Sequence, residues 1–176
     1  MKVTELLTVR RRPANKAQGL LTHGSITIPC AIGRGGPTAR KREGDGATPL
    51  GQFELLKVYY RPDRLRKPVT RLPVEPMHPM LGWCDAPADP CYNQPVLLPF
   101  AGSHEKLWRE DHLYDIVVVL DYNLFPPVDG KGSAIFFHLA RPDYSPTEGC
   151  VAVSLAHMLK ILASVGKETA MSIEAA

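Results

Sequence analysis

The chain has 176 residues, which suits a single domain, 1–176, and leaves little room for two. Its composition, 44% hydrophobic and 22% charged residues, is that of a soluble globular protein and excludes a disordered chain. The formal net charge of +3 is too small to indicate nucleic-acid binding, and no apolar run approaches the ~18 residues of a transmembrane segment.

The N-terminus and the cysteines bear on the compartment. Residues 1–16 lack the continuous apolar core and the cleavage site of a signal peptide, so either the chain is cytosolic or a leader has been removed. A chain of this length does not require disulfides; Cys84 and Cys91, on either side of a Pro-containing loop, are the pair that a bridge would join. No spacing of cysteines or histidines resembles a zinc site, so neither a metal nor a cofactor is expected.

In the first 60 residues the apolar pattern has a period of two. It predicts strands at 6–9, 24–32 and 51–60, punctuated by Gly and Pro. The last two are separated by a Gly-rich loop, 33–51, whose basic run Arg40–Arg42 we expect near a functional site.

Residues 61–112 have a different character, because nine of the 17 prolines fall there. Proline removes a ladder donor and fixes φ, so this segment is expected to be ordered loop and not sheet. A loop of this length in a compact domain is usually functional. We expect 61–112 to be an insertion that caps an active-site channel, with Trp83 and Tyr92 as walls of that channel.

The last third of the chain predicts two buried strands and a helix. Apolar β-branched and aromatic runs predict strands at 114–120 and 134–140, and a short strand follows at 151–153. Ser154 is a natural N-cap for a helix. The apolar face of that helix consists of Leu155, Met158, Leu159, Leu162 and Val165. The predicted fold class is therefore mainly β, with one principal helix near the C-terminus.

One histidine and one cysteine stand out as a reactive pair. His138 lies near the end of a predicted buried strand, and Cys150 follows twelve positions later, directly after Gly149. Glycine permits a tight turn that points successive backbone N–H groups into one concavity, where they would stabilise an oxyanion. A neighbouring imidazolium would lower the pKa of the thiol and make thiolate the resting state. The alternative is a structural cysteine and a core histidine.

Two blocks of sequence resemble the catalytic domain of YkuD-type L,D-transpeptidases. They are His138 with Thr147–Val151, and the upstream block Thr48–Phe53; the resemblance covers roughly residues 24–165. It implies a β-sandwich-like fold and a thioester mechanism acting on peptidoglycan stem peptides. In that mechanism Cys150 is the nucleophile and His138 the base. The resemblance further implies that the carbonyl of Leu139 orients the imidazole, that N–H groups near Gly149 and Cys150 form the oxyanion hole, and that Thr147 supports the loop.

The chain also departs from the family pattern at positions that would read the substrate. Leu139 and Glu148 replace the usual small and basic residues, and Ala152 stands where the family has Arg or Asn. A charge for substrate carboxylates must then come from elsewhere, and we expect Arg141 or the run containing Arg42 to supply it. Tyr122 either faces the cleft or packs in the core.

These departures and the Pro-rich insertion favour 1-3 cross-links over the 3-3 links that are the family default. The resemblance implies a periplasmic or cell-envelope location, against the cytoplasmic alternative from the N-terminus. Two other functions stay open. If water attacked the same thioester, the protein would be an L,D-carboxypeptidase or endopeptidase. If the domain bound peptidoglycan without catalysing a reaction, it would be a peptidoglycan-binding module. The oligomeric state is left open.

Overall fold

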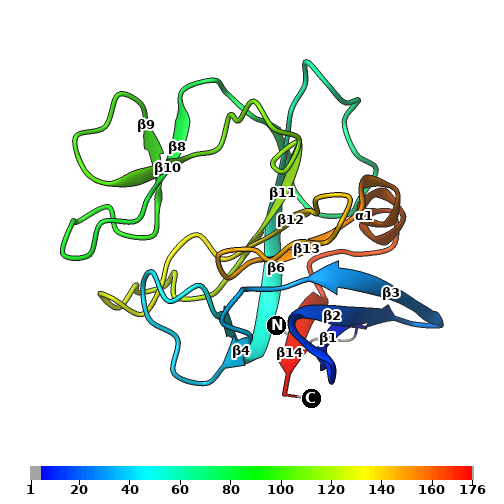
Figure 1. The fold of residues 1–176 in the computed structure, drawn as a ribbon. Helices are drawn as coiled ribbons and strands as arrows, with labels where there is room; N and C mark the ends of the chain where they lie inside the picture. Colours follow the sequence, from blue (N-terminus) through cyan, green and yellow to red (C-terminus); the bar gives the residue numbers. More distant parts are fainter. Residues whose placement is uncertain (1–4, 176) are drawn as a thin grey trace.

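The computed structural model describes residues 5–175, which form fourteen strands and one helix (Figure 1). In chain order the described elements are β1 (Glu5–Arg12), β2 (Asn15–His23), β3 (Ile26–Ala31), β4 (Pro37–Thr38), β5 (Thr48–Pro49), β6 (Gly51–Tyr60), β7 (Val74–Pro76), β8 (Leu81–Cys84), β9 (Pro95–Leu97), β10 (His104–Lys106), β11 (Ile116–Leu120), β12 (Phe136–Leu139), β13 (Val151–Val153), α1 (Leu155–Leu162) and β14 (Thr169–Glu174). The mainly-β prediction, with one helix near the C-terminus, is confirmed.

The main sheet of the described residues has nine strands and closes on itself. Its order is β11-β12-β13-β3-β2-β1-β14-β6-β7, and β11 also pairs with β6, so only β7 lies outside the ring. The narrowest join is between β13 and β3, which are in register at Ala152 and Ala31 alone. The closed arrangement therefore has its weakest seam beside the strand that follows Cys150.

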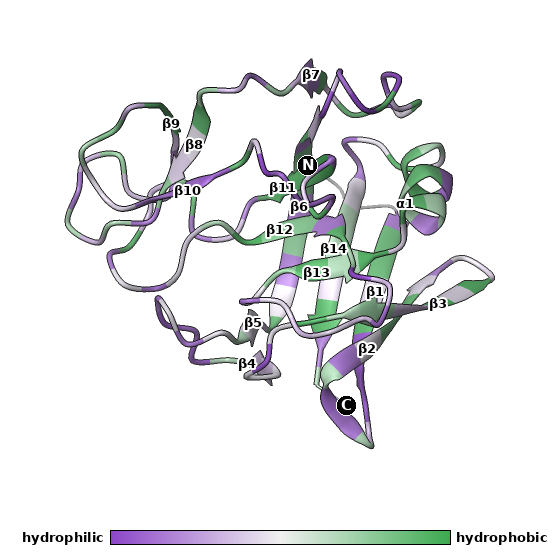
Figure 2. Ribbon diagram, turned by 45° about the horizontal axis from the view of Figure 1, so that its top comes forward, coloured by the Kyte–Doolittle hydropathy of each residue, from purple (hydrophilic) through white to green (hydrophobic). Residues whose placement is uncertain are grey.

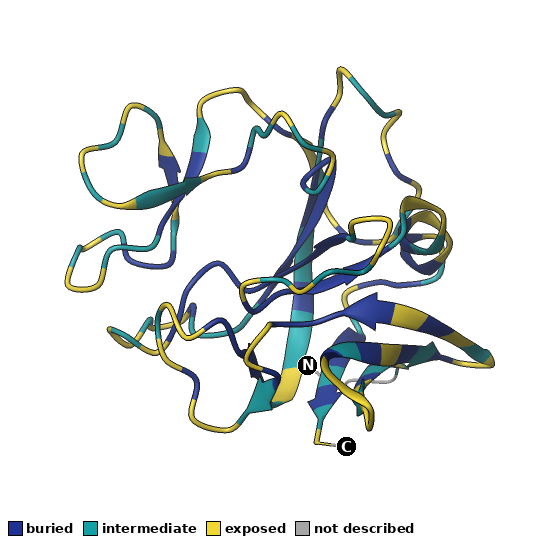
Figure 3. Ribbon diagram, in the orientation of Figure 1, coloured by how far each residue is buried: buried dark blue, intermediate teal, exposed yellow. Residues whose placement is uncertain are grey.

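Alternation along the buried strands separates two hydrophobic cores. Ile116, Val118 and Leu120 of β11 point into the core enclosed by the sheet, whereas Val117 and Val119 point into a second core. Residues that alternate along a strand face opposite sides of the sheet. Both faces of β11 are thus covered, which explains its continuous apolar run; Figure 3 shows β11 buried throughout.

Residues 61–112 contribute three buried side chains to the second core. Trp83, Leu107 and Met77 of this segment pack with Phe136 of β12, and the rings of Trp83 and Phe136 meet edge to face at 5.0 Å. The expectation of loop without sheet was wrong, because β8, β9 and β10 form a small antiparallel sheet. Proline is tolerated there because Pro95 opens β9 at an edge of that sheet. In Figure 2 this small sheet lies apart from the main one.

The helix begins as predicted, and Met158, Leu162 and Val165 of its predicted apolar face are buried in the core. The hydroxyl of Ser154 accepts a hydrogen bond from the N–H of His157, as an N-cap should. Met158, Ile161 and Leu162 are the buried residues; Leu155 and Leu159 are exposed, and Val165 lies beyond the helix end. No helix within residues 5–175 is long and apolar enough to cross a membrane.

Two strands that close the main sheet, β2 and β14, were not predicted from the sequence. β2 alternates correctly, but its inward residues include Ala17 and Gly19, which carry little hydrophobic signal. β14 adds in parallel to β1 near the end of the chain and pairs on its other edge with β6. Both strands complete the closed sheet, and neither contributes to the site described next.

Candidate active site

His138 is held on the outer face of the sheet by a backbone carbonyl. It shares that face with Phe136, two residues earlier in β12, and its ring meets Tyr114 edge to face at 5.0 Å. Its Nδ1 lies 2.9 Å from the carbonyl oxygen of Leu139. Since a carbonyl only accepts, Nδ1 carries the proton in the neutral ring and Nε2 is left as the basic atom. Burial lowers the pKa of His138 to about 4.

Cys150 is buried beside β12, with its thiol hydrogen-bonded to the backbone. Its Sγ lies 3.2 Å from the carbonyl oxygen of Ala134, to which the thiol donates, and accepts from the N–H of Phe136 at 3.3 Å. Burial raises the pKa of Cys150 to about 12, and the negative charge of Glu105 acts in the same direction.

The resting state therefore differs from the expected thiolate–imidazolium pair. A pKa of about 12 for the thiol and about 4 for the imidazole leaves both groups neutral at pH 7. The physical reason is burial, which disfavours the charged form of both groups. Among the described residues, the hydrogen bonds of the thiol go to Ala134 and Phe136, and that of the imidazole goes to Leu139.

The loop before Cys150 is tied together by Thr147. Its Oγ1 donates to the carbonyl of Cys150 at 2.6 Å and accepts from the N–H of Gly149 at 3.2 Å. Gly149 has φ +134°, and a Cβ there would lie 2.8 Å from the carbonyl oxygen of Ala47. The predicted support by Thr147 matches this geometry, whereas the N–H of Gly149 is already engaged.

The upstream block braces the same loop. The buried hydroxyl of Thr48 accepts from the N–H of Gly33 at 2.8 Å, and Gly33 forms a β-bridge with Thr147. The two blocks that are separate in sequence are thus joined through Gly33. This contact gives the upstream block a structural role behind the loop that carries Cys150.

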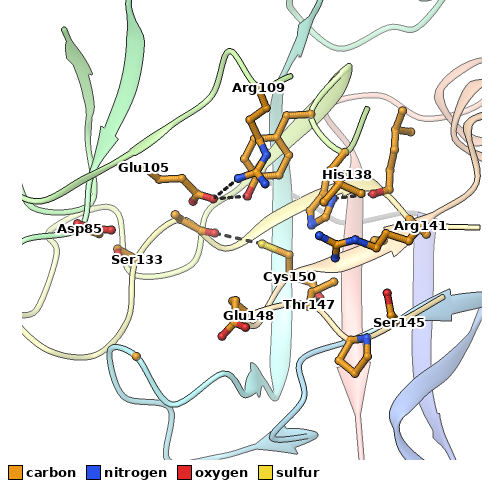
Figure 4. A pocket seen from close by; sticks show the side chains of 18 of the residues that line it. Asp85, Glu105, Arg109, Ser133, His138, Arg141, Ser145, Thr147, Glu148 and Cys150 are labelled. Carbon is orange, nitrogen blue, oxygen red and sulfur yellow. Dashed lines mark hydrogen bonds and ion pairs between the residues drawn. The ribbon is translucent and has the colours of Figure 1, made fainter. Parts of the chain in front are cut away.

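Cys150 and His138 open into one cavity of about 470 Å³ (Figure 4). Its lining residues are Lys41, Glu43, Gly44, Asp85, His104, Glu105, Arg109, Leu113, Tyr114, Ser133, Ala134, His138, Leu139, Ala140, Arg141, Ser145, Pro146, Thr147, Glu148, Cys150 and Ala152. The cavity therefore brings together the main sheet, the Gly-rich loop and the 61–112 segment around the thiol.

Of the predicted substrate-binding residues, only Arg141 lines this cavity, as an exposed side chain. Arg42 is exposed outside it, and its neighbour Lys41 takes the position at the wall. Tyr122 follows the core alternative: its ring packs edge to face on Phe53 at 5.4 Å and its hydroxyl donates to the carbonyl of Lys131.

Trp83 and Tyr92 lie behind the cavity, not on its wall. Trp83 is 3% exposed and donates through Nε1 to Asn93 Oδ1 at 2.9 Å. Tyr92 is 1% exposed and donates to Glu43 at 2.6 Å. Trp83 packs in the second core, and both side chains are almost fully buried, so neither presents a face to a ligand. Cys84 and Cys91 are free thiols, so the considered bridge is absent.

Three polar residues of the site had no role in the sequence interpretation. The ring of Tyr114 contacts that of His138 edge to face, and its hydroxyl donates a hydrogen bond to Glu105 Oε1 at 2.7 Å. Arg109 lies over the Tyr114 ring, 5.1 Å from its centroid. The only local signal was the position of Tyr114 at the start of a predicted strand; Glu105 and Arg109 reach the site through the fold of residues 61–112.

Comparison with known families agrees with this geometry. The family model described as YkuD, L,D-transpeptidase catalytic domain, matches residues 15–173. No curated protein and no solved structure gives a significant match. The matched range contains the whole of the cavity and both blocks that carry the resemblance. The chain belongs to the YkuD family of L,D-transpeptidase catalytic domains.

Proposed function

We propose that the protein is a peptidoglycan L,D-transpeptidase that works through a thioester on Cys150. The observation that carries this proposal is one cavity in which a buried thiol and an imidazole lie together, with the imidazole oriented by the Leu139 carbonyl at 2.9 Å. Family membership supports the reaction class. The fixed tautomer leaves Nε2 of His138 to act as the base.

The neutral resting pair suggests how the first step proceeds. As Sγ of Cys150 attacks a stem-peptide carbonyl, Nε2 of His138 takes the thiol proton, so no buried charge is needed beforehand. His138 then gives that proton to the leaving amine, and the acyl group remains as a thioester. Because the N–H of Gly149 is engaged by Thr147, the N–H of Cys150 is the proposed oxyanion donor.

The finer assignments belong to the same proposal. Arg141 at the cavity rim would hold a substrate carboxylate, in place of the basic or amide residue that Ala152 replaces. Residues 61–112 would cap the channel, since Asp85, His104, Glu105 and Arg109 of this segment line it. We favour 1-3 over 3-3 links on the departures from the family pattern, and a cell-envelope location because the substrate is there.

Incubation with defined muropeptides tests the function. Product masses of the wild type should show a cross-linked dimer, and those of Cys150→Ala should show none. A trimmed monomer without dimer would instead indicate the hydrolase, in which water takes the thioester. Absence of both products and of any acyl adduct would overturn the proposal and leave a peptidoglycan-binding module.

A further inference from the structure

One side of the cavity carries three carboxylates. Glu43 comes from the Gly-rich loop, while Asp85 and Glu105 come from residues 61–112, and all three line the cavity. Figure 4 shows Asp85, Glu105 and Ser133 on one side of Cys150, with Arg141 and Ser145 on the other. A fourth lining carboxylate, Glu148, forms an ion pair with Arg34, and Arg141 is the cation on the side opposite Asp85 and Glu105.

The cations on the carboxylate side are bound to other acids. Lys41 Nζ lies 2.5 Å from Asp45 Oδ1, and the Lys41 side chain is 5% exposed. Arg109 holds Asp111 through two hydrogen bonds of 2.9 and 2.7 Å. The remaining contact of Arg109, to Glu105, is 3.9 Å long. These pairs leave the three cavity carboxylates with a net negative charge.

Two of these carboxylates have an oxygen that accepts no hydrogen bond within the described residues. Asp85 Oδ1 is buried with no hydrogen-bond partner among the described residues. A buried oxygen without a partner is costly and indicates a missing donor. Glu105 uses Oε1 to accept from Tyr114, and burial together with the charges of Asp85 and Glu43 raises its pKa. Within residues 5–175, no three acidic, His or Cys groups are placed to hold a metal ion.

A primary ammonium is the cation that suits this wall. It offers three donors without demanding a metal's coordination geometry. Stem peptides carry several carboxylates, which the wall would repel, and a free amine on the diamino acid. Donor and acceptor share these groups, but only the acceptor's amine must reach the thioester carbon. The acceptor's amine is therefore placed on the carboxylate side and a carboxylate of the donor on the Arg141 side.

We propose that Asp85 and Glu105 form the subsite that binds the ammonium group of the acyl acceptor and delivers the amine to the Cys150 thioester. This inference rests on the proposed transpeptidase function and deepens it. The acceptor enters as an ammonium ion and loses one proton to solvent. Its nitrogen attacks the thioester carbon while His138 takes a second proton; the C–S bond breaks, and His138 returns that proton to the Cys150 thiolate.

The subsite is tested by separating the two half-reactions. Glu105→Gln and Asp85→Asn keep side-chain shape, and glutamine can still accept from Tyr114. Asp85→Asn should form the thioester with donor muropeptide at the wild-type rate, read as the intact-protein mass at short times. Because the charge of Glu105 acts on the Cys150 thiol, Glu105→Gln is judged after acylation, by how its thioester divides between acceptor and water. The ratio of dimer to hydrolysed donor at fixed acceptor concentration should fall about tenfold, as expected for losing one charged hydrogen bond. The matched control is Glu110→Gln, which removes an exposed carboxylate that does not line the cavity.

The possible results separate failure of the subsite from failure of the transpeptidase function. An unchanged ratio in both variants, with normal thioester formation, would overturn the subsite and leave the transpeptidase function standing. Slower thioester formation with an unchanged ratio would place the carboxylates on the donor side and overturn it too. Failure of the wild type to form any thioester would count against the function itself. If Glu110→Gln lowered the ratio of dimer to hydrolysed donor as much as Glu105→Gln does, the effect would come from the net charge of the protein, and the proposal would be contradicted.

Discussion

At the scale of single residues, burial decides the protonation of the reactive pair. Cys150 is 6% and His138 5% exposed, and each is more stable without charge. A nucleophile kept as a thiol reacts poorly until the substrate brings it close to the base. We therefore expect Cys150 to react faster with a substrate bound beside His138 than with a free electrophile.

This protonation state predicts the pH dependence of alkylation. Because the pKa of Cys150 is raised to about 12, the thiolate fraction should grow about tenfold per pH unit. The rate of modification by iodoacetamide, followed by peptide mass mapping at Cys150, should rise continuously from pH 6 to 10. A plateau between pH 5 and 8 would instead reveal a thiolate–imidazolium pair. Mapping separates Cys150 from the other three thiols, and Cys150→Ala provides the blank.

Gly149 makes a second prediction at this scale. A methyl group there would lie 2.8 Å from the Ala47 carbonyl oxygen, and φ is +134°. Gly149→Ala should lower the free energy of unfolding by about 3 kcal/mol, from backbone strain and overpacking together, and abolish acylation. Gly130 also has positive φ but has open space around its Cβ, so Gly130→Ala should cost about 1 kcal/mol. If urea unfolding showed the same loss of unfolding free energy for Gly149→Ala and Gly130→Ala, the close contact at Gly149 would be contradicted.

At the scale of elements, Asn93 links residues 61–112 to the strand beside the thiol. Its Oδ1 accepts from Trp83 Nε1 and from the N–H of Ala134, and its Nδ2 donates to the carbonyls of Tyr122 and Asn123. The Ala134 carbonyl in turn accepts from the Cys150 thiol. A residue of the Pro-rich segment therefore holds the backbone that positions the nucleophile.

Asn93→Ala should accordingly affect both stability and chemistry. It leaves several buried groups without partners, which should lower the free energy of unfolding by about 3 kcal/mol. The acylation rate should fall as well, because Ala134 is no longer fixed. Gln94→Ala, which removes a single 3.4 Å contact to the Leu124 carbonyl, is the control and should change neither appreciably. Normal acylation by Asn93→Ala would show that the link does not reach the thiol.

The elements also show which parts of the fold could be predicted from the sequence. The strands 51–60, 114–120, 134–140 and 151–153 were predicted to within two residues at each end. The first follows from a period-two pattern, and the other three from continuous apolar runs that signal burial on both faces. The small sheet of residues 61–112 was missed because prolines masked three-residue strands. Its aromatic residues were assigned to a channel wall, whereas a second core needed them.

The same division holds for the site. His138, Leu139, Thr147 and Cys150 are close in sequence, so a local motif could identify them. The Leu139 carbonyl and Thr147 make the contacts that the resemblance implied, and the roles of Cys150 and His138 stay predictions. Glu105, Tyr114 and Asn93 reach the site through long-range packing, which leaves no periodic or spacing signal. The charge of the cavity wall could therefore be seen only in the folded chain.

At the scale of the whole molecule, the two cores share β11 and β12, whose residues alternate between them. We expect them to unfold together. Both tryptophans, Trp83 and Trp108, lie in residues 61–112, so fluorescence reports this segment while far-UV circular dichroism reports the main sheet. The two urea transitions should have the same midpoint. An earlier fluorescence transition would show that residues 61–112 unfold independently and would weaken their role as a cap.

The central claim is that Cys150 carries the acyl group, and the intact-protein mass after brief incubation with a donor muropeptide tests it most directly. We expect the mass of the protein to increase by that of the donor acyl group, and peptide analysis to map this increase to Cys150. Hydroxylamine should reverse it, and Cys150→Ala should not show it. An adduct on another residue, or a cross-linked product formed by Cys150→Ala, would contradict it.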